Sequence, residues 1–293
     1  MDDATRKAEA LVEALGYIRT FRDRLTVIKL GGSAMEEPAA LRATLQSVVF
    51  LETVGLRPVL VHGGGKPIDR AMAAAGLVPR KILGRRYTDD ATLGIVVDVL
   101  TNDANAGIVR QIRELGGRAV GLHSTTLQAL HGERLTLPNP SGEPIDLGRV
   151  GHVTRVDAGL IADFANAGVV PVIPSLAYDA VGGWLNVNAD TAACAVAAAL
   201  KAAKFVMLTD TPGILRDPKD PATLVTRLDA ATCQRMVQAG EIDGGMIPKV
   251  EACFDALKAG VGQVHVIDGR RKYSLLLEIF TESGVGTEIV LQS

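Results

Sequence analysis

Two apolar segments of this chain run directly into clusters of glycine, and this feature constrains the fold more than any other. The segment VIKL at 27–30 continues as GGS, and the segment VLV at 59–61 continues as HGGGK. Glycine adopts positive φ without steric cost, so consecutive glycines can turn their amides toward one anion at the start of a following helix. We therefore predict two phosphate-binding loops that close two strands and face each other across one transferred group, with Lys29 beside them.

The common phosphate-binding motifs do not describe these loops. The P-loop pattern fails because Pro67 follows Lys66, and the dinucleotide fingerprint fails because Ile68 stands where its last glycine belongs. The combination of glycine-rich loop, H-R-D and D-F-G that marks protein kinases is also absent. For each loop taken alone, the alternative is a tight strand-to-helix turn without a ligand.

Length and composition fit an enzyme of ordinary size. The 293 residues allow one large α/β domain or two lobes, and the net charge of −2 offers no basic field for nucleic acid or a membrane surface. Three scattered cysteines and five histidines without ligand spacing predict neither a disulfide framework nor a metal site. The polar N-terminus and the lack of a long uncharged apolar stretch predict a cytoplasmic protein.

Strand-like apolar runs alternate with helix-like segments, which indicates an α/β fold with an open, mostly parallel sheet covered by helices on both faces. The predicted strands are 25–30, 58–61, 118–122, 169–173, 204–209 and 263–267. The predicted helices are 38–54, 66–75, 89–115, 157–167, 188–202, 229–239 and 247–258. Between 130 and 155, proline and glycine punctuate short segments, which predicts hairpins or an excursion over the active face.

A further helix is predicted before the first strand. Residues 4–22 alternate charges with Leu11, Val12, Leu15 and Ile18, which gives an amphipathic helix outside the core fold. Its apolar stripe needs a partner.

Two polar segments in the first two thirds of the chain are candidate binding sites. In LNVNADT at 185–191, an extended backbone would direct Asn186, Asn188 and Asp190 the same way, although a helix cap explains one of them. In GRRYTD at 84–89, two arginines precede a helix that Thr88 is expected to cap. A guanidinium fork suits a substrate carboxylate, and the alternative is a solvated surface arginine.

Two more segments lie in the last third. The sequence LTDTPGIL at 208–215 follows an apolar strand and turns at Pro-Gly, which places it at the sheet edge where open α/β folds bind ligands. The sequence GGMIPK ends in Lys249, which by itself would be a surface charge. Lys29, however, lies in an apolar run where a lone ammonium group is costly, so the two lysines are candidates for one anion site.

Together these segments resemble the N-acetylglutamate kinases, a branch of the amino acid kinase family. The matching segments occur in family order: VIKLGGSAM at 27–35, VHGGGKPID at 61–69, GRRYTD at 84–89, LNVNADTAA at 185–193, LTDTPGIL at 208–215, GGMIPKV at 244–250 and LLLEIFTESGVGTEIV at 275–290. The resemblance covers nearly the whole chain. It implies the amino acid kinase fold and transfer of a phosphoryl group from ATP to the side-chain carboxylate of N-acetyl-L-glutamate, the second step of arginine biosynthesis.

The resemblance also implies roles for single residues. Lys29 and Lys249 match the lysines that neutralise the transferring group, and Asp190 matches the carboxylate that organises them. The remaining expected residues are Gly64, Gly65, Arg86, Asn186 and Asn188 for the acceptor, and Gly31, Gly32, Thr209, Asp210 and Gly213 for the nucleotide. ATP is expected to bring Mg²⁺ with it. Because the acceptor carboxylate is already ionised at neutral pH, catalysis needs alignment and charge screening rather than a general base.

Regulation and assembly are implied in the same way. Residues 1–23 would be an oligomerisation helix, residues 24–183 an N-lobe for acceptor binding and dimerisation, and residues 184–293 a C-lobe for ATP. Arginine-inhibited members carry such a helix and form hexamers as trimers of dimers, and this chain matches their arginine site at His265, Glu278 and Gly284. The alternative is a packed helix whose Glu278 faces water. The resemblance also allows a PII signalling protein as a partner.

Two loops depart from the family pattern, at 123–126 and 178–181. They leave open a kinase for a related substrate, such as N-acetylated or carrier-linked aminoadipate. A protein of another class, a catalytically silent amino acid sensor, is a second alternative. The complete set of Lys29, Asp190 and Lys249 argues against silence.

Overall fold

The computed structural model describes residues 3–123, 127–139, 141–181, 183–242 and 244–292. Its centre is an eight-stranded sheet. In spatial order the strands are β16 (Arg227–Asp229), β18 (Thr287–Val290), β17 (Gln263–Asp268), β13 (Lys204–Thr209), β1 (Leu25–Leu30), β2 (Arg57–His62), β10 (Val170–Pro174) and β5 (Ala119–Gly121). The six strands from β17 to β5 run parallel, whereas β18 is antiparallel to β17 and parallel to β16. All six predicted strands and the predicted fold class are therefore confirmed.

Helices cover both faces of this sheet because its central strands bury side chains on both sides. Val27 of β1 packs into one core, while Ile28 and Leu30 pack into the other. The first core is closed by α6 (Ala158–Asn166), α7 (Ala189–Ala199), α8 (Ala230–Gln238) and α9 (Ile247–Lys258), and the second by α2 (Pro38–Thr53), α5 (Ala106–Glu114) and α10 (Ser274–Phe280). This alternation within near-continuous apolar strands is the pattern expected of a covered parallel sheet.

The segment predicted to leave the main sheet, 130–155, contributes to a smaller sheet together with two strands from residues 176–187. The strands β6 (Leu130–Arg134), β9 (Val150–Val156), β12 (Gly183–Val187) and β11 (Leu176–Asp179) pair in a closed four-stranded arrangement. Three short ribbons pair β3 (Lys81–Ile82) with β4 (Arg85–Arg86), β7 (Leu137–Pro138) with β8 (Pro144–Ile145), and β14 (Ile214–Leu215) with β15 (Leu224–Val225). The prediction of hairpins between 130 and 155 is confirmed.

The predicted helix at 89–115 is interrupted in a way that its sequence does not reveal. It consists of α4 (Asp90–Asp98), a seven-residue π-helix η2 (Val99–Asn105) and α5. A π-helix holds its residues by wider hydrogen-bonded rings and often marks a functional site. Helix α3 (Gly65–Ala74) begins in the second glycine cluster and packs against α4 and η2.

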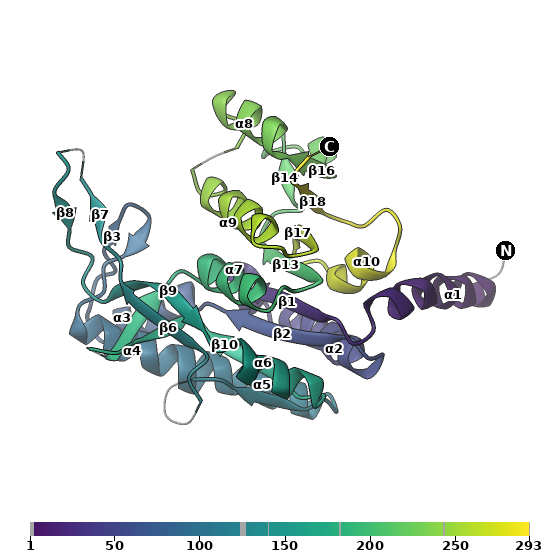
Figure 1. Ribbon diagram of the computed structural model, residues 1–293, viewed down its shortest axis with the longest axis horizontal. Coiled ribbons are helices and arrows are strands. Elements are labelled where there is room, and N and C mark those ends of the chain that lie inside the picture. The colour runs from purple at the N-terminus through teal and green to yellow at the C-terminus, as the bar shows by residue number, and fades with distance from the viewer. Residues whose placement is uncertain (1–2, 124–126, 140, 182, 243, 293) are drawn as a thin grey trace.

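The N-terminal helix α1 (Asp3–Phe21) projects from the rest of the molecule (Figure 1). Tyr17 and Ile18 pack against the second core, whereas Leu11, Val12 and Leu15 are exposed. The predicted amphipathic helix is confirmed, and part of its apolar stripe faces solvent. No helix in the described part of the chain is long and apolar enough to cross a membrane.

The lobe boundary predicted at 183/184 stays a prediction, and β12 runs across it. Strands from residues before the boundary occupy one half of the sheet and strands from residues after it occupy the other, with β1 and β13 adjacent at the middle. Because β1 and β13 are hydrogen-bonded along their length, one sheet runs through both halves. The glycine loop after β1 therefore lies at the junction between them.

Candidate active site

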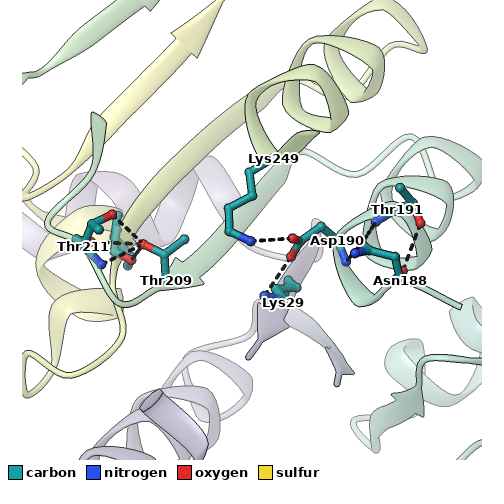
Figure 2. Close-up of polar contacts among 8 residues, drawn as sticks. Lys29, Asn188, Asp190, Thr191, Thr209, Thr211 and Lys249 are labelled. Carbon is teal, nitrogen blue, oxygen red and sulfur yellow. Dashed lines mark hydrogen bonds and ion pairs between the residues drawn. The ribbon is translucent and has the colours of Figure 1, made fainter. Parts of the chain in front are cut away.

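Two lysines from distant parts of the chain bind one carboxylate at the middle of the sheet (Figure 2). Lys29, near the end of β1, places its Nζ 2.7 Å from Oδ1 of Asp190. Lys249, in the first turn of α9, places its Nζ 2.8 Å from the other oxygen, Oδ2. The three charged residues predicted to act together are thus in direct contact.

Burial makes this cluster unusual. Lys29 and Asp190 are 6% and 7% exposed, so neither charge is well solvated. Burial alone would raise the pKa of Asp190, but the two ammonium groups outweigh it and lower that pKa to about 2. A Cβ on Gly31 would overlap Nζ of Lys29, so the first glycine of its loop gives the lysine room to bend back to Asp190. The result is one net positive charge fixed at the carboxyl end of the central strand β1.

The three alternating polar residues before α7 have three different partners. Asn186 lies in β12 and donates to Oγ1 of Thr88. Asn188 caps α7, its Oδ1 accepting from the backbone amides of Asp190 and Thr191. The segment is extended only as far as Asn188, so the expectation that all three side chains point the same way is wrong: Asp190 belongs to the first helical turn, which rotates its side chain toward the lysines.

One cavity of about 170 Å³ brings together all five residues predicted to bind the acceptor. Its lining includes Gly64, Gly65, Arg86, Asn186 and Asn188. The start of α3 lies in this lining, and the exposed amides of a helix N-terminus favour an anion. The cavity is therefore suited to a small carboxylate ligand.

Arg86 is held in this cavity by several partners, among them Asp69, Gly65 and the sulfur of Met72. Its side chain is 9% exposed, and its Nη1 lies 2.5 Å from Oδ1 of Asp69 while Nη2 donates to the carbonyl of Gly65. The alternative of a solvated surface arginine is therefore wrong. No role for Asp69 was predicted from the sequence. Its position in α3, one turn after Gly65, is the sequence feature that places it near the cavity.

Thr88 does not cap the following helix. The N-cap of α4 is Asp89, whose carboxylate accepts from the amide of Thr92, because a carboxylate one residue later reaches the helical amides directly. Thr88 is instead buried, donating to the carbonyl of Arg86 and accepting from Asn186. It connects the two segments that bear the predicted acceptor residues.

A second cavity has a volume of about 500 Å³. Its lining includes Lys29 and Lys249 together with the predicted nucleotide residues Gly31, Gly32, Thr209 and Asp210. The fifth, Gly213, lines a smaller apolar cavity of about 70 Å³ with Ile214, Leu215 and Ile242. Thr211 and Met246 line both, so a polar cavity with two cations continues into an apolar one.

A separate cavity of about 230 Å³ contains His265, Glu278 and Gly284, the three residues predicted to bind arginine. Tyr17 of the N-terminal helix and Lys204 of β13 are among its other lining residues. Lys204 lies 4.4 Å from the ring centre of Phe21, and burial lowers its pKa to about 8 despite the neighbouring glutamates. The wall of this cavity thus includes α1.

The carboxylate of Glu278 does not face water, so that alternative is wrong. Its Oε1 lies 2.6 Å from Nδ1 of His265, and its Oε2 accepts from the amides of Val285 and Gly286. Burial acts to raise the pKa of Glu278, but these bonds outweigh it and lower that pKa. Gly284 has φ +58, and a Cβ there would lie 3.0 Å from Oε2.

Of the two loops that depart from the family pattern, residues 124–126 lie outside the described residues. In the other, Tyr178 of β11 packs edge-on against Trp184 of β12, with ring centres 5.2 Å apart.

The sequence matches the model of the amino acid kinase family over residues 24–268. Among curated proteins, the acetylglutamate kinase of Heliobacterium modesticaldum is 44% identical over 98% of this chain and 99% of its own length. That of Methanothermobacter thermautotrophicus is 44% identical over 95% and 97%, and that of Akkermansia muciniphila 41% identical over 97% and 95%.

Solved structures resemble the chain as well. An N-acetylglutamate synthase from Neisseria gonorrhoeae complexed with coenzyme A and N-acetyl-glutamate has a TM-score of 0.85 at 26% identity, covering 98% of this chain. The same synthase complexed with coenzyme A and L-arginine has a TM-score of 0.82 at 25% identity. This chain spans 64% and 66% of the synthase chains in these two structures. A carbamate kinase from Giardia lamblia bound to AMP-PNP shares the fold, with a TM-score of 0.62 at 16% identity.

Proposed function

The chain belongs to the amino acid kinase family, and we propose that it transfers the γ-phosphoryl group of ATP to the side-chain carboxylate of N-acetyl-L-glutamate. The product is N-acetyl-L-glutamyl 5-phosphate, formed in the second step of arginine biosynthesis. Full-length relatives at 41–44% identity, all acetylglutamate kinases, favour this activity over an aminoadipate kinase or a silent sensor. The contact of Lys29 and Lys249 with Asp190 is the main structural support for phosphoryl transfer.

The acceptor occupies the cavity lined by Gly64, Gly65, Arg86, Asn186 and Asn188. Arg86 presents its guanidinium to the α-carboxylate, and because Asp69 already fixes that group, little ordering is left to binding. The glycine amides and the start of α3 receive the reacting carboxylate. Asn188 and Ala189 line this cavity and directly precede Asp190, so the acceptor lies next to the charged cluster.

The nucleotide occupies the cavity lined by both lysines and the apolar cavity next to it. Its phosphates lie by Lys29, Lys249 and the loop of Gly31 and Gly32, and its base enters the apolar extension at Gly213. Asp210 is the carboxylate in the described lining of the larger cavity. Mg²⁺ binds through one or two carboxylates and substrate phosphates, so this lining fits an ion carried by ATP, which screens phosphate charge.

The reaction needs no general base, because the attacking carboxylate is ionised at neutral pH. The protein has to bring two anions together and stabilise the charge that spreads over the transferring phosphoryl group. Asp190 sets the two ammonium groups on either side of its carboxylate, 2.7 and 2.8 Å away. The lysines are thereby ordered before the substrates arrive.

L-Arginine is the feedback inhibitor in this proposal, bound in the cavity of His265, Glu278 and Gly284. The synthase structure with L-arginine, at a TM-score of 0.82, supports this choice of ligand. Because Tyr17 of α1 lines the cavity, a ligand there contacts the helix whose exposed Leu11, Val12 and Leu15 would pack between dimers in a hexamer. A PII partner and a cytoplasmic location stay predictions from the sequence.

A direct assay tests the activity. ADP release is measured with N-acetyl-L-glutamate, with N-acetyl-L-aminoadipate and without an acceptor, each at saturating MgATP. We expect rapid release with the first substrate, at least about a hundredfold above the second, on the scale by which a polar site rejects a ligand that misplaces a bonded group. Equal rates with both acceptors would contradict the proposed specificity, and release independent of any acceptor would contradict phosphoryl transfer.

A further inference from the structure

A buried histidine lies directly behind the glycine loop of the acceptor cavity. His62 ends β2 and is fully buried. Its Nδ1 lies 3.1 Å from the carbonyl oxygen of Gly63, and its Nε2 lies 3.0 Å from Nδ2 of Asn105. His62 takes no part in the charge chemistry proposed above, yet every polar atom of its ring has a partner.

The hydrogen bonds of Asn105 determine which ring nitrogen of His62 carries the proton. Nδ2 of Asn105 donates to the carbonyl of Val172, at 2.9 Å, and a carbonyl can only accept, so the amide nitrogen must face it. The same amide nitrogen faces Nε2 of His62, which therefore accepts. The proton must be on Nδ1, which donates it to the carbonyl of Gly63. Burial lowers the pKa of His62 to about 4, and nearby His123 acts in the same direction, so the ring stays neutral near pH 7.

This bond orients an amide of the acceptor cavity. The peptide between Gly63 and Gly64 is planar and trans, so its carbonyl oxygen and its N–H point in opposite directions. Fixing the carbonyl of Gly63 on the histidine side therefore fixes the N–H of Gly64 on the other side. Glycines on both sides leave this peptide free to rotate unless something holds it.

The π-helix η2 also holds the Gly63–Gly64 peptide in place. Its last residue, Asn105, bonds His62, and its Leu100 packs against Gly64 so closely that a Cβ there would lie 2.7 Å from Cδ2 of the leucine. The π-helical turns thus present one polar and one apolar contact to the same loop. Asn105 is 1% exposed, which isolates its bonds from competing water.

We propose that His62 and Asn105 are positioning residues of the acceptor site. Asn105 holds the neutral Nδ1–H form of His62, and His62 holds the Gly63–Gly64 peptide so that the amide of Gly64 is directed into the cavity. This role rests on the proposed function, because it is the acceptor that this amide receives.

The first experiment uses the unaltered protein and needs no activity. In ¹⁵N-histidine-labelled protein, NMR spectroscopy reports which nitrogen of each of the five histidines is protonated. We expect one ring in the Nδ1–H form between pH 6 and 8, assigned to His62 by its loss in His62→Asn. In Asn105→Ala the same ring should gain Nε2–H character. A native His62 protonated on Nε2 would overturn the proposal.

The second experiment compares two amide replacements of His62. In His62→Asn the amide nitrogen is as many bonds from Cα as Nδ1 and can still donate to Gly63. In His62→Gln it is as many bonds away as Nε2 and reaches toward Asn105 instead. We expect His62→Asn to keep kcat/KM for N-acetylglutamate within about twofold and His62→Gln to lower it about fivefold to tenfold, the scale of one hydrogen bond. KM for ATP should change less than about twofold in both.

Two controls separate positioning from loss of stability and from failure of the proposed function. Ser47→Ala removes another buried hydrogen bond, from Oγ to the carbonyl of Ala43 within α2, and should lower Tm without changing KM for the acceptor. Equal acceptor kinetics in His62→Asn and His62→Gln at similar Tm would refute the positioning role. If native protein transfers no phosphoryl group to N-acetylglutamate, the proposed function fails, while the tautomer of His62 is still decided by NMR.

Discussion

Replacing Asp190 by Asn tests the centre of the proposed site. The change removes one negative charge that two ammonium groups share at 2.7 and 2.8 Å, and leaves Lys29, which is 6% exposed, without a charged partner. The lowering of the Asp190 pKa from 3.8 to about 2 corresponds to roughly 2 kcal/mol of folding stability. An unpaired buried lysine adds to this loss, so we expect Asp190→Asn to cost about 2–4 kcal/mol at pH 7.

The pH dependence gives the sign of the effect. Because folding lowers the pKa of Asp190, the stabilisation is fully present above the unfolded value near 4 and is lost as pH falls toward about 2. Native protein should therefore lose this part of its stability between pH 4 and 2, and Asp190→Asn should lack that part of the slope. The activity of the variant should also fall by at least about a hundredfold, since its lysines are no longer ordered.

Urea unfolding at pH 7 and at several values between pH 4 and 2 measures both effects. The control is Asp163→Asn, which neutralises an exposed carboxylate on α6 and should change stability by less than about 0.5 kcal/mol. ATP should restore part of the stability of Asp190→Asn, because its phosphates give both lysines a partner. A variant as stable as the native protein, with the same acid slope, would refute the view that Asp190 organises the two lysines.

Three further predictions concern the other parts of the site. Lys29→Ala or Lys249→Ala should lower kcat by roughly a hundredfold or more while binding of ATP changes less, and near-normal turnover of a folded variant would remove that lysine from the mechanism. Arg86→Ala should weaken N-acetylglutamate binding by about 1.5–3 kcal/mol with Arg86→Lys intermediate, and loss of ATP affinity instead would mean that the two cavities are assigned in reverse. Arginine should inhibit sigmoidally with a coupling of about 1–3 kcal/mol, and deleting residues 1–22 should convert hexamers to dimers and flatten that response. Light scattering with an arginine titration checks the last prediction, which a full-length dimer indifferent to millimolar arginine would contradict.

The sequence determined the chain's local elements because their causes are local. Apolar runs long enough for one strand, separated by helical periodicity, identified the six parallel strands of the main sheet, which are β1, β2, β5, β10, β13 and β17. The amphipathic repeat identified α1. Glycine clusters after β1 and β2 located the two loops, because parallel strands end at one edge of a sheet. The family resemblance supplied residue roles, and the structure gathers those residues into neighbouring cavities.

Only the tertiary structure decided how distant segments meet. The pairing of β1 with β13, which brings Lys29 to Asp190 and Lys249, depends on the packing of the whole sheet. The predicted helix cap at Thr88 was wrong by one residue, because Asp89 caps α4. The contacts of Arg86 with Asp69 and of His62 with Asn105 join residues 17 and 43 positions apart. The residue type determines a side chain's charge and shape, whereas its burial and its hydrogen-bond partners depend on how the whole chain packs. Burial and partners determine the pKa of Asp190 and the ring nitrogen of His62 that carries the proton.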